Sequence, residues 1–191
     1  MSYFYIYGRN CSQKGQLHMD AKQLAEKMRG KRAEEILALA VEHVPNVCFA
    51  SSFGAEDVVL MHMISSLQLE IPMFTLDTGR LPEETYDVME RIRKKYDCKL
   101  EIYFPDREEV ERLETELGMY SFRKSIKNRK QCCAIRKIQP LQRALQGKDG
   151  WITGLRRSQS ITRSSLEVAE SDSLMGGLIK INPLIDWSEE E

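Results

Sequence analysis

The segment that decides the fold is Val47-Cys48-Phe49-Ala50-Ser51-Ser52-Phe53-Gly54-Ala55-Glu56-Asp57. Residues 47–51 form a short apolar run typical of a buried strand, and a helical stretch follows from Glu56 to about Leu67. The small residues between them let backbone N–H groups approach an anion, and the helix N-terminus adds a favourable dipole. The Lys-Ser/Thr ending of a Walker loop is absent, and a plain tight turn is the alternative. The segment therefore predicts a strand and a helix joined by a candidate anion-binding loop.

The same alternation continues along the chain. Strand-like runs are predicted at 72–76, 100–104, 151–153 and 178–181, and helices at about 82–96 and 107–117. Such a repeat is typical of βαβ units, so we predict an α/β fold with a parallel twisted sheet flanked by helices. Asp20 is expected to cap an earlier helix whose apolar positions run from Leu24 to Val41. We therefore divide the chain into an N-terminal extension, 1–20, and one domain, 21–191.

A second polar turn, Leu76-Asp77-Thr78-Gly79-Arg80, follows the run at 72–76. Parallel sheets bind ligands at the carboxyl ends of their strands, which is where this turn and the loop after residue 51 both fall. A carboxylate, a flexible glycine backbone and a cation can together hold a nucleoside and a phosphate. For this segment alone, the alternative is a helix-capping turn with a surface arginine.

Bulk composition is that of an ordinary globular protein. The 191 residues are 42% hydrophobic and 30% charged, without an apolar run of bilayer length or a secretory signal pattern. Five cysteines, of which Cys11, Cys48 and Cys98 are scattered, fit a reducing cytoplasm better than secretion. The net charge of −1 hides twelve Lys or Arg against one acid, Asp149, within residues 122–166. This basic stretch suits a small polyanion or nucleic acid, and a solvated basic face is the alternative.

Two adjacent cysteines, Cys132 and Cys133, lie in a predicted helix inside the basic stretch. A disulfide between sequence neighbours is strained, and neighbours on a helix point in different directions, so a structural bridge is not expected. Cations that would stabilise thiolates flank the pair at Arg129, Lys130, Arg136 and Lys137. This setting suits metal ligation, with two buried apolar cysteines as the alternative.

Five segments together resemble the sulfonucleotide reductases. They are Ser-Phe-Gly-Ala-Glu-Asp at 52–57, Leu-Asp-Thr-Gly-Arg at 76–80, Cys-Cys-Ala-Ile-Arg-Lys at 132–137, Trp-Ile-Thr-Gly-Leu-Arg-Arg-Ser-Gln-Ser-Ile-Thr-Arg at 151–163 and Asn-Pro-Leu-Ile-Asp-Trp at 182–187. They follow the order of the family, and the likeness runs from Val47 to the last residue. It implies an adenine nucleotide alpha hydrolase-like fold of the PP-loop ATP pyrophosphatase type. It also implies an enzyme that reduces adenylyl sulfate, or its 3′-phosphorylated form, to sulfite and the nucleotide.

The resemblance further implies roles for individual residues. In the family, the double cysteine matched by Cys132 and Cys133 holds half of a [4Fe-4S] cluster and marks members that use adenylyl sulfate. A cysteine thiolate attacks the substrate sulfur and expels AMP, and thioredoxin or glutaredoxin then releases sulfite. Lys137 and Arg163 match positions whose cations hold the phosphosulfate. The expected substrate-binding residues are Ser51, Ser52, Phe53, Gly54, Glu56, Asp57, Asp77, Thr78, Gly79, Arg80, Lys137, Arg156 and Arg163.

The sequence departs from the family pattern in two places. A second Cys-x-x-Cys pair and a nucleophilic cysteine in a Glu-Cys-Gly-Leu-His segment are both absent. We therefore assign no catalytic residue within this chain and expect it to be an incomplete form, truncated at its C-terminal end. Such a polypeptide is expected to bind adenylyl sulfate or AMP weakly and to form no sulfite alone.

Three other functions compete with this interpretation. A reductase for 3′-phosphoadenylyl sulfate differs only in its substrate. An adenylating pyrophosphatase-like enzyme would use ATP, but such enzymes carry a Gly-Gly-x-Asp-Ser type of loop where this chain has Ser-Phe-Gly-Ala-Glu-Asp. A nucleic-acid-binding module is disfavoured because aromatic residues are not interleaved with the Lys and Arg residues. We expect a nucleotide and a thioredoxin or glutaredoxin as partners, no nucleic acid and no membrane; the sequence leaves a homo-oligomer open.

Overall fold

The computed structural model describes residues 19–159, 166–188 and 190. The N-terminal extension therefore lies outside the described residues, apart from its last two positions. The elements are, in chain order, α1 (Ala21–Met28), α2 (Ala33–His43), β1 (Val47–Ser51), α3 (Ala55–Ser66), β2 (Met73–Leu76), α4 (Glu83–Tyr96), β3 (Leu100–Tyr103), α5 (Arg107–Leu117), η1 (Ser121–Arg123), α6 (Ile126–Cys133), η2 (Ala134–Ile138), α7 (Gln139–Ala144), β4 (Gly150–Ile152), η3 (Arg157–Gln159), β5 (Ala169–Asp172), η5 (Ser173–Met175) and β6 (Leu178–Ile181). Within these described ranges, no helix has both the length and the apolar character needed to cross a bilayer.

The strands of the described chain form one sheet in the order β3-β2-β1-β4-β6-β5. All neighbours are parallel except β5, which pairs with β6 in the antiparallel sense. The chain moves from β1 outward to β2 and β3, then returns to the other side of β1 at β4. Ligands of open parallel sheets bind where the strand order reverses in this way, at the carboxyl ends of the strands. The predicted α/β fold is confirmed.

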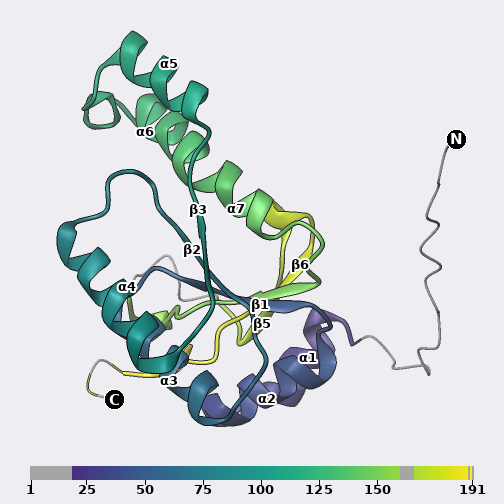
Figure 1. Cartoon of the computed structure of the whole chain (residues 1–191). Coiled ribbons are helices and arrows are strands. Elements are labelled where there is room, and N and C mark those ends of the chain that lie inside the picture. The colour runs from purple at the N-terminus through teal and green to yellow at the C-terminus, as the bar shows by residue number, and fades with distance from the viewer. Residues whose placement is uncertain (1–18, 160–165, 189, 191) are drawn as a thin grey trace, which may run out of the picture.

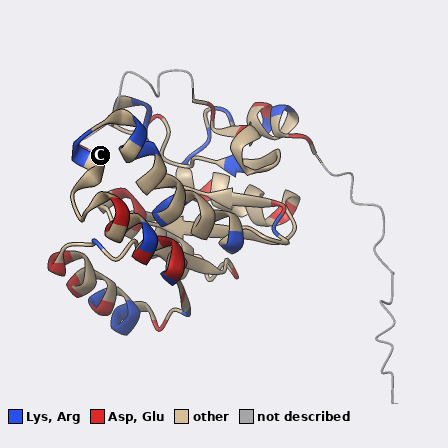
Figure 2. Ribbon diagram, turned by 90° about the horizontal axis from the view of Figure 1, so that it is seen from above, with Lys and Arg blue, Asp and Glu red and all other residues tan. Residues whose placement is uncertain are grey.

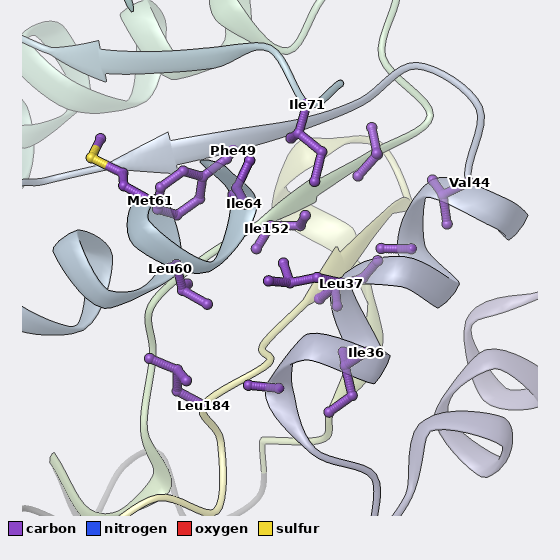
Figure 3. Packing of buried hydrophobic residues seen from close by; sticks show 14 of the residues in the cluster. Ile36, Leu37, Val44, Phe49, Leu60, Met61, Ile64, Ile71, Ile152 and Leu184 are labelled. Carbon is purple, nitrogen blue, oxygen red and sulfur yellow. The ribbon is translucent and has the colours of Figure 1, made fainter. Parts of the chain in front are cut away.

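Helices α1 to α4 cover one face of the sheet (Figure 1). Under them lies the larger core, in which side chains from α2, α3, β1 and β4 pack together (Figure 3). Phe49, Leu60 and Ile152 have no exposed surface there. Full burial of a side chain of this size contributes roughly 1.5–3 kcal/mol. This face therefore supplies most of the apolar stabilisation of the fold.

The opposite face is covered by α7, while α5 and α6 extend beyond the sheet (Figure 1). Successive residues of a strand point to opposite faces, so in β1 Phe49 enters the larger core and Cys48 the smaller one. The smaller core is centred on Cys48, Phe74, Ala144, Leu145 and Met175. Fewer apolar side chains are buried on this side, which leaves space above the strands.

Two local features differ from the sequence prediction. The helix expected over Leu24 to Val41 is split into α1 and α2, because Gly30 adopts a φ of 71° just after α1 ends. Asp20 does cap α1, and its carboxylate accepts a hydrogen bond from the Gln23 N–H. Strand β5 is the second difference. Its sequence, Ala169-Glu170-Ser171-Asp172, has no apolar run, because it lies at the edge of the sheet.

The described cations of the basic stretch are spread over η1, α6, η2, α7, η3 and the loops between them, and the five helical segments contain no Asp or Glu. Figure 2 shows that the protein carries its acids on other parts of the ribbon. Arg136, Arg143 and Arg156 donate hydrogen bonds to carbonyl or carboxylate groups within the fold. Part of the positive charge in this stretch is therefore used to hold segments of the protein together.

Candidate functional site

A pocket of about 440 Å³ opens on the α7 side of the sheet, at the carboxyl ends of β1 and β2. It is lined by Ala50, Ser51, Ser52, Phe74, Thr75, Leu76, Thr78, Arg80, Leu81, Phe122, Arg129, Cys132, Cys133, Arg136, Lys137, Leu141 and Trp151. This lining contains four Lys or Arg and no Asp or Glu. An apolar wall combined with cations favours a ligand that has both an apolar ring and an anionic group.

The loop after β1 is fixed by Asp57, in the first turn of α3. The Asp57 carboxylate accepts hydrogen bonds from the N–H and the hydroxyl of Ser52, at 2.5 and 2.8 Å. Gly154 lies against the same carboxylate, so closely that a Cβ on Gly154 would come within 2.2 Å of Asp57 Oδ1. Burial raises the pKa of the Asp57 carboxyl, although the hydrogen bonds from Ser52 oppose this shift. Asp57 therefore shapes the loop, and Ser51 and Ser52 form its contribution to the pocket.

Phe53 and Gly54 lie in the same loop but outside the pocket lining. The Phe53 side chain is buried in the larger core, and its backbone adopts a φ of 61°. Its N–H donates to Ser51 Oγ at 3.0 Å, and Gly54 is the N-cap residue of α3. Both residues turn the chain from β1 into α3.

The turn after β2 is organised by Asp77, which is buried. One carboxylate oxygen accepts the Gly79 N–H at 2.8 Å, and the other accepts the Tyr86 hydroxyl at 2.8 Å. The hydrogen bond to Asp77 raises the pKa of Tyr86. Gly79 has a φ of 70°, a conformation that favours glycine at this point of the turn. Thr78 and Arg80 line the pocket, whereas Asp77 and Gly79 shape the turn that presents them.

Arg80 and Arg136 meet on a single carboxylate, that of Glu114 on α5. Nη2 of each guanidinium lies 2.5 Å from Glu114 Oε1. Arg136 also donates to the carbonyl of Thr78 at 2.6 Å and is 6% exposed. Burial of Glu114 raises its pKa, but hydrogen bonds from the two arginines outweigh this and hold the pKa below its ordinary value. The three side chains connect α5, the turn after β2 and η2 at the pocket wall.

Arg156 does not line the pocket, because its side chain pairs with Glu56. Arg156 Nε donates to Glu56 Oε1 at 2.8 Å, and Gln159 Nε2 donates to the same oxygen at 2.8 Å. Although burial raises the pKa of Glu56, hydrogen bonds from its own N–H, Arg156 and Gln159 lower it overall. The pair joins the loop after β4 to the start of α3. Arg163, the remaining predicted cation, lies outside the described residues.

The helix that carries the cysteines changes geometry beside the pocket. α6 ends at Cys133, and the following residues form the π-helix η2, in which the Gln139 N–H bonds to the Ala134 carbonyl. Pro140 explains this change, because it has no N–H to offer and its ring would clash with the Arg136 carbonyl in a regular α-helix. Single π turns inside helices are frequent at functional sites.

Cys132 and Cys133 are free, partly exposed thiols on the pocket wall. A [4Fe-4S] cluster is typically held by the thiolates of a Cys₄ ligand set. Cys132 and Cys133 could supply half of such a set. Across the described ranges, including the surroundings of Cys132 and Cys133, no group of three or more His, Cys, Asp or Glu could hold a metal ion. Burial raises the pKa of the Cys48 thiol to about 12 and also raises that of Cys98. Neither of these thiols offers a thiolate at neutral pH.

The structure thus brings together part of the predicted site. The predicted residues on the pocket wall are Ser51, Ser52, Thr78, Arg80, Cys132, Cys133 and Lys137. Those described but outside the lining are Phe53, Gly54, Glu56, Asp57, Asp77, Gly79 and Arg156. Sequence reasoning also omitted the apolar wall of Phe74, Leu141 and Trp151, although the alternation of strand side chains would have placed Phe74 and Leu76 on one face.

Fold and site together define a class: an α/β domain with the adenine nucleotide alpha hydrolase type of fold and a pocket lined by cations at the strand ends. Residues 46–191 match the phosphoadenosine phosphosulfate reductase domain. The chain belongs to this family.

Curated relatives agree with this assignment. Adenosine 5′-phosphosulfate reductase of Allochromatium vinosum is 43% identical over 163 residues, which are 85% of this chain and 63% of that protein. The enzyme of the same name from Burkholderia cepacia is 42% identical over 169 residues, 88% of this chain and 66% of the relative. The chain therefore spans slightly less than two thirds of the length of these two relatives.

Solved structures show the same architecture. Phosphoadenylyl-sulfate (PAPS) reductase from Candida auris, in a phosphate complex, superposes with a TM-score of 0.75 at 28% identity, covering 93% of this chain and 83% of that one. FMN adenylyltransferase from Candida glabrata, in complex with ATP, has a TM-score of 0.55 at 12% identity, covering 92% of this chain and 55% of the other. The second likeness concerns the fold alone.

Proposed function

We propose that this chain is the nucleotide-binding part of a reductase that converts adenylyl sulfate to sulfite and AMP in sulfate assimilation. The observation that carries the proposal is the convergence of four family segments on one pocket. The loop after β1, the turn after β2, the double cysteine and Trp151 all line it. The names of the curated relatives point to the same substrate.

In this proposal, the two parts of the pocket bind the two parts of the substrate. Phe74, Leu141 and Trp151 supply apolar surface for the adenosine moiety. Lys137 and Arg129 are exposed at the pocket and supply positive charge for the phosphosulfate. Cations beside the phosphate would also stabilise the charge that develops on it as AMP leaves.

The proposed reaction is a two-electron reduction. A cysteine thiolate attacks the sulfur of adenylyl sulfate, the sulfur–oxygen bond to the phosphate breaks, and AMP leaves with the bonding electron pair. A second thiol, from thioredoxin or glutaredoxin, then attacks the thiosulfonate and releases sulfite, leaving a disulfide. The Glu-Cys-Gly-Leu-His segment that carries the attacking cysteine in the family does not occur among the 191 residues. This chain contributes binding and orientation to that reaction.

Cys132 and Cys133 are proposed as half of the ligand set of a [4Fe-4S] cluster. When bound to these two residues, the cluster would hold the end of α6 in place beside the pocket. Anaerobic reconstitution followed by iron and sulfide analysis tests the residues directly. The Cys132→Ser/Cys133→Ser variant should retain less iron than the wild-type chain, and equal retention would contradict the assignment.

Equilibrium binding tests the proposed function. Isothermal titration calorimetry of the 191-residue chain should show that it binds adenylyl sulfate and AMP. GMP should bind more weakly than AMP. 3′-Phosphoadenylyl sulfate should bind less tightly than adenylyl sulfate; the reverse order would favour the 3′-phosphorylated substrate. Absence of binding by all four nucleotides would refute the proposal.

A further inference from the structure

A single carboxylate ties the helical arm to the pocket. The arm consists of α5, η1 and α6, which extend beyond the sheet (Figure 1). Glu114 on α5 accepts from Arg80, which follows β2, and from Arg136 in η2, through the same oxygen. Its side chain is 14% exposed, against 27% for Arg80 and 7% for Arg136. Glu114 itself is not part of the pocket lining.

The two arginines are held by further contacts around this carboxylate. Arg80 Nη2 also donates to the Met119 carbonyl, and its guanidinium lies 4.6 Å from the centre of the Phe122 ring. Arg136 Nη1 donates to the Thr78 carbonyl, two residues before Arg80. The buried Nε of Arg136 has no hydrogen-bond partner among the described residues. These contacts fix each guanidinium but use only part of its N–H groups.

We propose that Glu114 is a positioning residue that holds Arg80 and Arg136 side by side on the pocket wall, where the pair recognises the phosphate of the bound nucleotide. This inference rests on the proposed function. It assigns a role in substrate recognition to a residue that does not touch the substrate.

The physical reason lies in like-charge repulsion. Two guanidinium groups that share one acceptor oxygen would separate if the carboxylate were absent, because each would be left as an unpaired, poorly solvated charge. The lowered pKa of Glu114 fits this arrangement, since it keeps the carboxylate ionised. A carboxylate near an anion site also repels the anion. The geometry indicates that ordering the arginines outweighs this repulsion, because charge-assisted hydrogen bonds to both cations fix their orientation.

A comparison of two ligands, AMP and adenosine, distinguishes a positioning role of Glu114 from a role in supporting the fold. AMP and adenosine share the base and ribose, and only AMP carries the phosphate. In Glu114→Gln and Glu114→Asp, AMP affinity measured by titration calorimetry should fall about tenfold, a typical consequence of losing about 1.4 kcal/mol. Adenosine affinity should change less than about twofold. Glu114→Asp keeps the charge but shortens the side chain by one methylene, so the carboxylate cannot reach both guanidinium groups.

Glu111→Gln is the matched control. It removes the same charge from the same helix, at a side chain that is 65% exposed and pairs only loosely with Arg107, at 3.6 Å. AMP affinity should be unchanged in this variant. Circular dichroism confirms that every variant is folded before titration.

Each other outcome overturns the inference. Tighter AMP binding in Glu114→Gln would mean that Glu114 only neutralises the arginines. Equal losses for AMP and adenosine, or unfolding of both Glu114 variants, would mean that it only supports the fold. If the wild-type chain does not bind AMP at all, the proposed function is refuted, and the inference with it.

Discussion

The two faces of the sheet differ in how completely they are filled. Under α1 to α4, Leu37, Leu60 and Ile152 have no exposed surface, and the core is continuous. Under α7, a pocket of about 440 Å³ separates the strand ends from the helices. The side covered by α1 to α4 therefore contributes most of the stability, and the side covered by α7 contains the pocket. Substitutions on the closed face should mainly change the free energy of unfolding, and those on the open face should mainly change binding.

A matched pair of leucine substitutions tests this comparison most strongly. Leu60→Ala removes a fully buried side chain from the closed face and should lower the free energy of unfolding by about 2–5 kcal/mol. Leu141→Ala removes a partly exposed side chain from the pocket wall and should cost roughly 1 kcal/mol. Urea unfolding of both variants measures the difference. Equal losses would show that the faces contribute alike.

Gly154→Ala should affect both faces at once, because Gly154 lies where the loop after β4 meets the start of α3. The added Cβ would fall 2.2 Å from Asp57 Oδ1 and 3.2 Å from the Asp57 backbone nitrogen. Displacing Asp57 should cost about 1–3 kcal/mol of stability and also move Ser52 out of position. Thermal unfolding and AMP titration together check this. Normal AMP affinity in a destabilised variant would show that Ser52 does not depend on Asp57.

The raised pKa of Asp57 should make part of the stability pH-dependent. The folded protein binds this proton more tightly than the unfolded chain, so the contribution is complete below the ordinary pKa of 3.8 and is lost as pH rises through the raised value. As the pH rises from the ordinary pKa of 3.8 through the raised value, wild-type stability should therefore fall relative to Asp57→Asn, by roughly 1.4 kcal/mol for each tenfold difference in proton affinity. The lowered pKa of Glu114 acts in the opposite direction, and its effect cancels because both proteins contain this residue. Parallel stability curves would contradict the prediction.

The smallest effect on stability is expected at the double cysteine. Cys132→Ser/Cys133→Ser changes two partly exposed thiols on the open face, so unfolding of the iron-free protein should shift by no more than about 0.5 kcal/mol. Chemical denaturation without iron measures this. A loss comparable to that of Leu60→Ala would place the cysteines among the core residues.

Strands with apolar runs could be predicted from the sequence, because burial on both faces demands such runs. Val47–Ser51 and Leu178–Ile181 have the predicted boundaries. Ala169–Asp172 could not be found in this way, since an edge strand needs no continuous apolar run. A glycine followed by charged residues indicates the helix break at Gly30. The apolar residues on both sides of Gly30 nevertheless keep a helical spacing, which favours one continuous helix.

Pocket residues could be predicted where a local motif itself contains the hydrogen-bond donors that line the pocket. They could be predicted only in part where residues far away in the sequence orient these donors. Ser52 and Arg80 line the pocket as their motifs indicate. Asp57 and Asp77 belong to the same motifs, but they accept hydrogen bonds from the protein backbone, which residue type alone does not reveal. Glu114 meets partners 34 and 22 residues away, and no local pattern marks it.

The π turn at Ala134–Ile138 separates two helical registers. One residue added to or removed from an α-helix turns every later side chain by about 100°. The wide turn accommodates an extra residue, so the sheet-facing side of α7, with Leu141 and Ala144, is set independently of the end of α6. A one-residue deletion here would change the rotation of the two cysteines relative to α7, which packs on the sheet. Length variation at this point among relatives should therefore alter the chemistry of the site while sparing the fold.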